Sequence, residues 1–497
     1  MRYSTAAILK TILLTGVFLT GGFLTGCMVG PDYEKPETPL PGSFQDAGAK
    51  DYRTDAVEIE WWSEFQDPIL DRLIRDALAG NYDIDIATAR ILEARALRAE
   101  TEFELAPIVP FQGDYTWQRS SRAQTFPGAD RNTELFDAGF DAVWELDIFG
   151  RIRRTIEADT AELESRIATR QDVVVTLLAE VARNYFELRG AQNGLAVARR
   201  NAENQKNTLD LTITLLEGGR GTALDVSRAR AQYNNTLALI PPLETKVKQA
   251  IYRIGVLTGQ LPDTYLAELL KPEPFPAVPD VVAVGTPVEL LERRPDIRVA
   301  ERQLAAFTAS IGIATADLFP RISILGSAAL QATTFSGLFD SGAGAFGVGP
   351  SIFWPAFDLG RVYQRVEAAD ARTQAAFAAY QQTVLAAIED VDSSLVDHNN
   401  QIERHKYLVE SVKESENAME LARMRYDYGV ANFLDVLDAE RTLLETQSEL
   451  ARSETELRTS LVAVYKALGG GWEYYEEDVR AQQAAGKAGE AAGEARQ

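Results

Sequence analysis

Aspartates occupy matching places in two similar stretches of this sequence, GGRGTALDV and YGVANFLDV, and Asp435 of the second lies 210 residues after Asp225 of the first. Thr222 precedes Asp225 by three positions, as Asn432 precedes Asp435. This spacing is typical of a capping box, in which two side chains satisfy free backbone N–H groups at the start of a helix. Asp225 and Asp435 are therefore expected to cap helices and to face their positive dipole ends. Asp438 is not at a cap position and is free for another role.

The single cysteine of the chain indicates a different chemistry. Residues 11–24 form an apolar run behind two basic residues, which is typical of a secretory signal and too short to span a bilayer as a helix. The run ends in Leu-Thr-Gly followed by Cys27, which resembles the lipobox of bacterial lipoproteins, where cleavage before the cysteine leaves its thiol to be acylated. We expect a lipoprotein signal peptide at 1–26 and a covalent lipid on Cys27, with an unpaired reactive thiol as the alternative.

Charge and hydropathy limit the partners. Removal of residues 1–26 takes away two basic and no acidic residues, so the formal net charge changes from −23 to −25. Nucleic-acid binding needs a basic face, and we therefore expect no nucleic-acid partner. No run of eighteen apolar residues follows residue 27, and so no transmembrane helix is expected.

Motifs of catalysis and of cofactor binding are weak in this sequence. His398 and His405 lie seven residues apart in a polar helical stretch without a ligand cluster, so we interpret them as solvated or interhelical side chains. GAGAFG, which starts at Gly342, matches a dinucleotide fingerprint, but an alternating strand with Pro350 follows it where a helix would be needed. GGRG, which starts at Gly218, is better read as a turn that ends a helix than as a phosphate loop. We predict no catalytic residue, no metal site and no cofactor other than the lipid, and we expect a protein that is not an enzyme.

The body of the chain is predicted to be an internal repeat. A shift of 210 residues places Trp144 on Trp354 and needs no gap over more than a hundred residues. Two halves of the same plan are implied, each far longer than the repeats of solenoid proteins. The expected order is a lipidated extended tether at 27–60, a first structural repeat at 61–270, a second structural repeat at 271–472, and a disordered tail at 473–497.

Long helices are expected in both halves, because proline is absent and glycine is sparse over stretches of roughly 70 residues. At 1.5 Å per residue such a helix would reach about 100 Å, which is too long for a compact core. The second helix of each half keeps an apolar residue at every seventh position, which indicates left-handed supercoiling against its neighbours. Pro241 and Pro242 fall inside the first of these, where we expect a kink or a break. The expected helices are 150–217, 222–258, 360–427 and 432–468.

Four shorter segments alternate apolar and polar residues with a period of two, and their apolar faces are rich in aromatic side chains. This pattern is typical of strands in a transmembrane β-barrel, and a soluble sandwich with one buried face is the alternative. Four strands cannot close a barrel and open edges are not viable in lipid, so the barrel interpretation requires several copies of the chain. The expected strands are about 108–118, 136–147, 321–331 and 345–354.

Several motifs together resemble those of the outer-membrane factor family, the TolC-like and OprM-like exit ducts of tripartite efflux pumps. They are WWSEFQDPILDRLIRDALAGNYDIDIATARILEARA at 61–96, ERRPDIRVAERQLAAFTASIGIATADLFPRISILG at 292–326, the FGR and LGR triplets before the long helices, and the two LDV turns. The start CMVGPDYEKP at 27–36 is similar to that of the lipoprotein branch of the family, the NodT type. The resemblance covers roughly residues 27–472, nearly the whole expected mature chain.

The resemblance implies a fold class that is mainly α with a transmembrane β-barrel. In this family a homotrimer shares a 12-stranded barrel, with 4 strands per chain, and a long periplasmic α-helical barrel continues the duct. The implied location is the outer membrane of a Gram-negative bacterium, with a lipid anchor and a body that extends into the periplasm. The implied partners are outer-membrane lipid, a periplasmic adaptor protein and an inner-membrane pump that is driven by protons.

The resemblance also places the two LDV turns at the periplasmic tip, where a ring of carboxylates from three chains would narrow the duct. Such a ring repels itself and stays closed only if bonds to neighbouring groups compensate. Where a basic residue helps to lock the tip in TolC, this chain has Ala431, and Arg220 and Arg425 are both candidate replacements. The implied gate residues are Tyr426, Asp435, Asp438 and Asp225. The implied adaptor contacts are Gly219, Thr222, Leu224, Gly429 and Leu434.

The function implied by the resemblance is passive export of drugs or other small toxic solutes that the pump and adaptor hand over. The duct of a type I protein secretion system is an alternative within the same family. A lipid-anchored coiled-coil scaffold without a pore is an alternative of a different class, against which the alternating strands speak.

Overall fold

The computed structural model describes residues 28–45, 52–53, 55, 57–126, 128, 130–279 and 282–477. Cys27 and the expected signal peptide at 1–26 lie outside these residues. The chain divides into two compact units, and each is described by itself. Unit 1 takes the described residues up to Glu37 together with 90–166 and 299–381, and unit 2 takes 38–89, 167–298 and the described residues from 382 onward.

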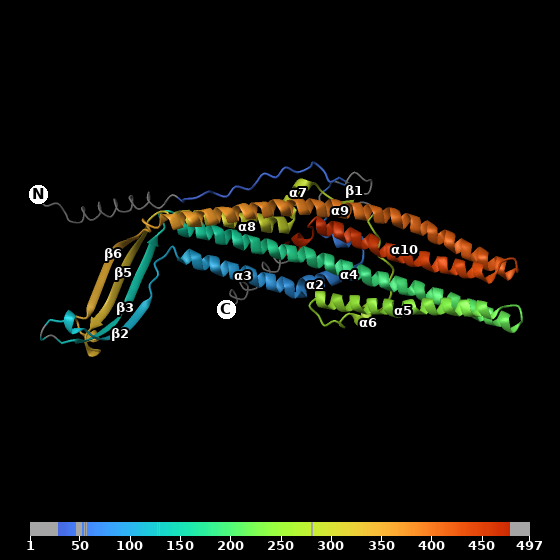
Figure 1. The fold of residues 1–497 in the computed structure, drawn as a ribbon, viewed down its shortest axis with the longest axis horizontal. Coiled ribbons are helices and arrows are strands. Elements are labelled where there is room, and N and C mark those ends of the chain that lie inside the picture. The colour runs from blue at the N-terminus through green and yellow to red at the C-terminus, as the bar shows by residue number, and fades with distance from the viewer. Residues whose placement is uncertain are drawn as a thin grey trace, which may run out of the picture. The chain divides into compact units, whose positions relative to one another are not determined.

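Unit 1 contains an antiparallel sheet in the strand order β2-β3-β5-β6 (Figure 1). Its strands are β2 (Phe111–Arg119), β3 (Asn132–Leu146), β5 (Arg321–Ala332) and β6 (Gly344–Phe353). The glycine-rich stretch after Gly342 therefore leads into a strand, as expected, and not into a nucleotide-binding helix. The short 3-10 helices η2 (Arg122–Gln124) and η3 (Ser336–Phe339) lie in the connections β2–β3 and β5–β6.

Two strands differ from their expected bounds. β2 begins at Phe111 instead of 108, because Pro107 and Pro110 have no N–H to donate to a ladder, and Ile108 keeps only an isolated bridge to Val143. β3 begins at Asn132 instead of 136, since its polar first residues still pair with the far end of β2. Backbone pairing thus extends beyond the apolar alternation that the sequence reveals.

Two tryptophans at the ends of β3 and β6 make matching hydrogen bonds within unit 1. The segment after α3 (Tyr82–Phe103) accepts a hydrogen bond at Leu105 O from Trp144 Nε1 at 2.9 Å. The segment after α8 (Pro295–Ala316) accepts one at Leu318 O from Trp354 Nε1 at 3.0 Å. The two tryptophans that the 210-residue shift superposes therefore make the same kind of contact at the ends of β3 and β6.

Unit 2 contains two helical hairpins, each made of the end of a long helix and the helix that follows it (Figure 1). The long helices α4 (Arg151–Glu217) and α9 (Leu359–Asp427) have 67 and 69 residues, and α5 (Ala223–Leu257) and α10 (Phe433–Ala467) have 35 each. Each helix begins and ends within one residue of the expected bounds. Within the described residues, no helix joins sufficient length to sufficient apolar character to cross a membrane.

We expected a kink or a break at Pro241 and Pro242, and the break is wrong. α5 runs through both prolines as one helix. The carbonyls that lose their donors there belong to Leu237 and Ala238, which are exposed. Water can therefore solvate these carbonyls, and the hydrogen bonds on either side maintain the helix.

The remainder of unit 2 is a layer of short elements around the helices. They are η1 (Trp61–Phe65), α2 (Pro68–Gly80), α6 (Leu266–Leu269), α7 (Pro287–Arg293) and the parallel pair β1 (Tyr52–Arg53) with β4 (Val282–Ala283). Trp61 stacks on Tyr465 of α10 with ring centroids 4.9 Å apart, and both side chains are buried. Part of the expected tether, Tyr52–Arg53, is thus a strand of the folded body.

The expected start of the disordered tail at 473 is wrong. Residues 472–477 form a further short helix, which residues 468–471 separate from α10. Trp472 Nε1 donates to Arg293 O at 3.0 Å, and Arg170 pairs with Glu476 at 2.5 Å. An aromatic and an acidic side chain therefore hold this short helix in place. The low-complexity composition of the residues that follow it hid this order in the sequence. Residues 478–497 lie outside the described part.

Candidate functional site at the two turns and at the strand ends

The first turn (residues 218–222) joins α4 to α5 and has the geometry expected of a helix end. Gly219 has a φ of 71°, a left-handed conformation that glycine adopts without strain. The N–H groups of Arg220 and Gly221 both donate to Leu215 O, at 2.8 and 2.9 Å. The chain can therefore reverse direction within five residues without leaving the last carbonyls of α4 unsatisfied.

The start of α5 is capped as the spacing predicts. Thr222 Oγ1 accepts a hydrogen bond from Asp225 N at 3.1 Å and donates one to Asp225 Oδ2 at 2.6 Å. The carboxylate thus lies in the first turn of the helix, where the helix dipole favours negative charge. The structure confirms the capping interpretation of this pair.

The second turn (residues 428–432) joins α9 to α10 and repeats this geometry. Gly429 has a φ of 74°, and Val430 N donates to Arg425 O at 2.9 Å. Asn432 forms a reciprocal capping box with Asp435: each side chain accepts from the other residue's backbone N–H at 3.2 Å. Asp435 is therefore held by its own helix, as the sequence predicts.

A hydrophobic cluster ties the two turns together within unit 2. The ring of Tyr426 lies 5.7 Å from that of Phe433, which is 5% exposed. Burial raises the pKa of the Tyr426 phenol, and the nearby carboxylates of Asp225 and Asp427 raise it further. The phenol is therefore neutral at physiological pH. The cluster consists of Leu209, Val226, Ala229 and Phe433, with Ile213, Tyr233, Tyr426 and Leu437 packed against them.

Asp438 is separate from this cluster. Arg441 Nη2 donates to its Oδ1 at 2.8 Å, and the two side chains are 65% and 60% exposed. Neither Arg220 nor Arg425 forms an ion pair with any described residue, so Arg441 is the cation that the structure gives to this carboxylate. The three-residue spacing on one helix face could have revealed this pair in the sequence.

A groove of about 690 Å³ lies beside Asp435 and Asp438, between α9 and α10. Small and acidic side chains make up most of its surface. Leu434 borders it and is 51% exposed, and Leu224, at the start of α5, is 56% exposed. The lining residues are Ser411, Glu414, Ser415, Ala418, Ala422, Leu434, Asp435, Asp438, Ala439 and Thr442.

Glu440 is a buried carboxyl group that the sequence analysis missed. Thr208 Oγ1 donates to its Oε1 at 2.5 Å, and its buried Oε2 has no hydrogen-bond partner among the described residues. Burial raises the pKa of Glu440, although the hydrogen bond from Thr208 and the charge of Arg423 oppose the shift. Glu440 lies in a polar stretch of the sequence, and nothing in that stretch indicates that this carboxyl group is buried.

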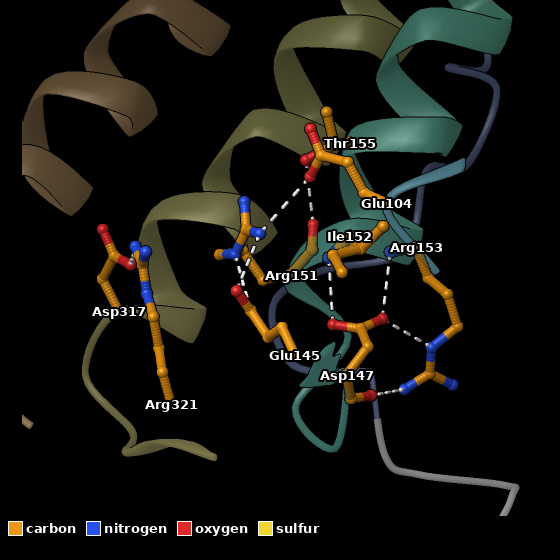
Figure 2. Close-up of polar contacts among 9 residues, drawn as sticks. All are labelled: Glu104, Glu145, Asp147, Arg151, Ile152, Arg153, Thr155, Asp317 and Arg321. Atoms are coloured by element: carbon orange, nitrogen blue, oxygen red, sulfur yellow. Dashed lines mark hydrogen bonds and ion pairs between the residues drawn. The ribbon is translucent and has the colours of Figure 1, made fainter. Parts of the chain in front are cut away.

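The strand ends in unit 1 carry a second polar arrangement (Figure 2). Asp147, just after β3, caps α4: its Oδ1 accepts from Ile152 N at 2.9 Å and its Oδ2 from Arg153 N at 3.1 Å. Arg153 Nε also donates to Oδ2 at 3.0 Å. One carboxylate therefore connects the end of β3 to the first turn of α4.

Ion pairs surround this junction. Arg151 lies next to Glu145, with Nε 2.9 Å from Oε1, and reaches Glu104 Oε2 at 3.4 Å (Figure 2). In the second half, Asp317 receives Arg321 at 2.5 Å and Arg365 at 3.2 Å. These charges lie where the aromatic strands end, although the sequence analysis did not single them out. The FGR triplet was the available signal.

The strands themselves expose apolar side chains that no other described residue covers. Phe346 is 92% exposed and Val348 is 81% exposed. Contiguous exposed apolar surface of this kind marks a contact with lipid or with another protein chain. Other exposed members are Phe111, Tyr115, Trp117, Ile352 and Phe353.

The histidines take part in helix packing. His398 is buried and its Nδ1 lies 2.9 Å from Ser460 Oγ of α10. This contact confirms the interhelical interpretation of His398. Burial lowers the pKa of His405 on the same helix. Within the described residues, no group of three or more His, Cys, Asp or Glu side chains could hold a metal ion.

Known proteins match the chain over most of its length. The family described as outer membrane efflux protein matches residues 73–260 and 286–470. The solvent efflux pump outer membrane protein SrpC of Pseudomonas putida is 32% identical over 457 residues, which cover 90% of this chain and 96% of SrpC. Nodulation protein T of Rhizobium leguminosarum bv. trifolii is 30% identical over 453 residues, which cover 90% and 95% of the two chains.

Solved structures give the same result. The outer-membrane channel OprN is 41% identical with a TM-score of 0.84, and the match covers 90% of this chain and all of OprN, 100%. The outer membrane channel MtrE of Neisseria gonorrhoeae, in its open state, is 28% identical with a TM-score of 0.77, and the match covers 90% of this chain and 99% of MtrE.

Proposed function

The chain belongs to the outer membrane efflux protein family, and from this premise we propose that it is the exit channel of a tripartite efflux system. It acts in the outer membrane of a Gram-negative bacterium and extends into the periplasm. The observation that carries this proposal is the 41% identity to OprN along the full OprN chain. SrpC is named as an outer membrane protein of a solvent efflux pump, and OprN and MtrE are named as outer-membrane channels, which supports the same function.

The pore is a homotrimer in which each chain contributes β2, β3, β5 and β6 to a twelve-stranded barrel. Three observations support this part of the proposal. The sheet order leaves β2 and β6 as edges, and unpaired edges are not viable in lipid. Phe346 and Val348 of β6 present apolar surface outward. The ion pairs of Arg151 and Asp317 stand at the strand ends, where a hydrocarbon layer would give way to water.

The two turns form the inner mouth of the duct. Tyr426, Asp225, Asp435 and Asp438 gate it, and the exposed Leu224 and Leu434 meet a periplasmic adaptor together with Gly219, Thr222 and Gly429. The hydrophobic cluster supports this role, because it packs the helices beside both turns against one another. A lipid on Cys27 anchors the chain. The two halves, which the 210-residue shift relates, have the same plan.

Transport through the duct is passive, and the energy comes from an inner-membrane pump driven by protons. The cargo consists of drugs or other small toxic solutes. A deletion strain of the source bacterium tests this function by its accumulation of a fluorescent dye such as ethidium. We expect a several-fold higher accumulation that the intact gene reverses. Collapse of the proton gradient should raise dye accumulation in the deletion strain, which shows that active export can be detected. If this control works and the deletion strain accumulates no more dye than the parent, another channel performs the export.

A further inference from the structure

The N-terminal strap, which we define as residues 28–33, is fixed to the body of unit 1. It has no regular secondary structure, and the sequence predicted an extended tether at this place. Val29 N nevertheless donates to Phe149 O at 3.3 Å, next to the start of α4. Four further hydrogen bonds and one cation–π contact, described below, hold the strap over its whole length.

Arg154 of α4 is the centre of these contacts, and its side chain is only 1% exposed. Its Nε donates to Val29 O at 3.1 Å, and its Nη2 donates to Gly30 O at 3.2 Å and to Asp32 Oδ1 at 2.8 Å. Its Nη1 donates to Glu157 at 2.7 Å on the same helix. Without the strap, two of its nitrogens would lose their acceptors while the guanidinium stayed in a buried place, which is costly for a charged group.

Three glycines shape the space that receives the strap. A Cβ on Gly150 would lie 2.9 Å from Met28 Cα, and Gly150 has a φ of +79°. A Cβ on Gly30 would lie 2.4 Å from Gly312 Cα of α8, and one on Gly312 would lie 2.7 Å from Arg154 Cδ. Strap, α4 and α8 therefore approach so closely that a methyl group cannot be added at any of these positions without a shift.

The C-terminal end of the strap is held by a polar and an aromatic contact. Tyr33 donates its hydroxyl hydrogen to Glu301 of α8, and the guanidinium of Arg302 lies 5.4 Å from the centre of the tyrosine ring. Burial and the bond to Glu301 raise the pKa of Tyr33, so the phenol keeps its proton. Glu301 is 7% exposed, which makes it a built acceptor instead of a chance surface contact.

We propose that Gly150, Arg154, Glu301 and Gly312 form a docking notch for the N-terminal strap of the same chain. The notch fixes the segment that follows Cys27 to the start of α4 and to α8. Any anchor bonded ahead of Met28 would then act on this junction directly, and not through a loose tether of some thirty residues. The docking goes beyond the proposed channel function and does not depend on it, because it requires only contacts within unit 1.

The test is the rate at which the endoproteinase Glu-C cleaves after Glu34 in the purified full-length protein. Glu34 itself is exposed, but Tyr33 and the rest of the strap, which precede the cleaved bond, must detach from the notch before the protease can bind this segment. Gly312→Leu fills the notch, and Gly360→Leu is the matched control, since a Cβ on Gly360 meets nothing within 4 Å. We expect at least tenfold faster cleavage in Gly312→Leu and wild-type rates in the control. Equal rates in the two variants would overturn the proposal.

Arg154→Met keeps the test decisive where Gly312→Leu does not fold. Methionine has a comparable length but no donors, so the carbonyls of Val29 and Gly30 lose their bonds, and we again expect cleavage to be at least tenfold faster. Asp32→Asn should change the rate less than twofold, because the Asp32 side chain is 87% exposed and the backbone carbonyls carry the docking. Wild-type cleavage in Arg154→Met would overturn the proposal irrespective of any result on transport.

Discussion

The two turns have the same backbone conformation but differ in the side chains that follow them. Both place a glycine at a φ of 71° or 74° and a capping residue three positions before an aspartate. Phe433, which opens α10, is buried, whereas Ala223, its counterpart in α5, is exposed. The glycine and the capping residue, which both turns have, therefore reverse the chain direction. Only the second turn is followed by a buried aromatic side chain.

The charges after the turns are opposite. α10 carries Asp438 and Glu440, and the positions of α5 that correspond under the 210-residue shift carry Arg228 and Arg230. Both arginines are exposed, while Glu440 is buried. The comparison teaches that the acidic side chains of the proposed mouth belong to the start of α10, whereas the start of α5 is more basic. Four substitutions, ordered by expected effect, test this division.

Phe433→Ala should have the largest effect. Removal of a buried aromatic side chain costs about 3 to 5 kcal/mol in a packed core, and Phe433 is the anchor of the cluster between the turns. Hydrogen exchange of the first amides of α10 would measure this loss as faster local opening. Leu434→Ala, at the exposed neighbouring position, is the control and should change the opening free energy by about 0.5 kcal/mol or less. Equal effects of the two substitutions would remove the special status of the second turn.

Glu440→Gln should stabilise the second turn at neutral pH. The folded state raises the pKa of Glu440, so the stabilisation from its protonated form is complete below the ordinary carboxyl pKa and is lost as pH rises through the raised value. Glutamine stays neutral, and its side-chain oxygen can still accept from Thr208. The substitution therefore removes the buried charge, whose burial costs about 1 to 3 kcal/mol. Thermal unfolding across pH 4 to 8 measures the gain, with the exposed Glu445→Gln as control. A wild-type pH dependence in Glu440→Gln would contradict the burial argument.

Asn432→Ala should cost about 1 kcal/mol, the usual value for loss of an N-cap. Thr222→Ala removes both bonds of the Thr222 hydroxyl to Asp225, whereas Asn432→Ala removes one bond and keeps the backbone N–H that donates to Asp435, so Thr222→Ala should cost at least as much. Local hydrogen exchange at the starts of α10 and α5 compares the two directly. A clearly smaller loss at Thr222 than at Asn432 would contradict the order that we infer from the hydrogen bonds.

Asp438→Ala should barely change stability, by about 0.5 kcal/mol or less, because its pair with Arg441 is exposed. Its expected effect is on the resting state of the mouth: loss of this carboxylate, like Tyr426→Phe, should loosen the closed turn and raise the conductance of trimers in a planar bilayer. Conductance identical to that of the wild type would exclude these residues from the gate.

The local features of the fold could be predicted from the sequence. The long proline-free stretches gave α4 and α9, and period-two alternation located the four strands. The cap spacing located Asp225 and Asp435 at helix starts. Each of these rests on interactions within about one turn or one strand, which a linear pattern preserves.

Features that depend on distant partners could not be predicted. Nothing around Arg154 reveals that it will be buried under Val29 and Gly30, more than a hundred residues away. The burial of Glu440 follows from the packing of α10 on α4, and residues 472–477 are ordered by Arg293 and Arg170. Pro241 and Pro242 misled for the same reason, since the exposure of the freed carbonyls is a tertiary property.

The most direct test of the central claim, that the two turns are the mouth of a conducting duct, is single-channel recording on a thiol-labelled variant. Leu434→Cys places a thiol at an exposed position of α10, two residues after the second turn, and wild-type protein, whose only cysteine is Cys27, is the control. We predict stepwise conductance in both proteins, and a reduced step after a bulky thiol reagent is added to Leu434→Cys alone. Folded trimers that do not conduct, or a Leu434→Cys conductance that the reagent leaves unchanged, would contradict the account.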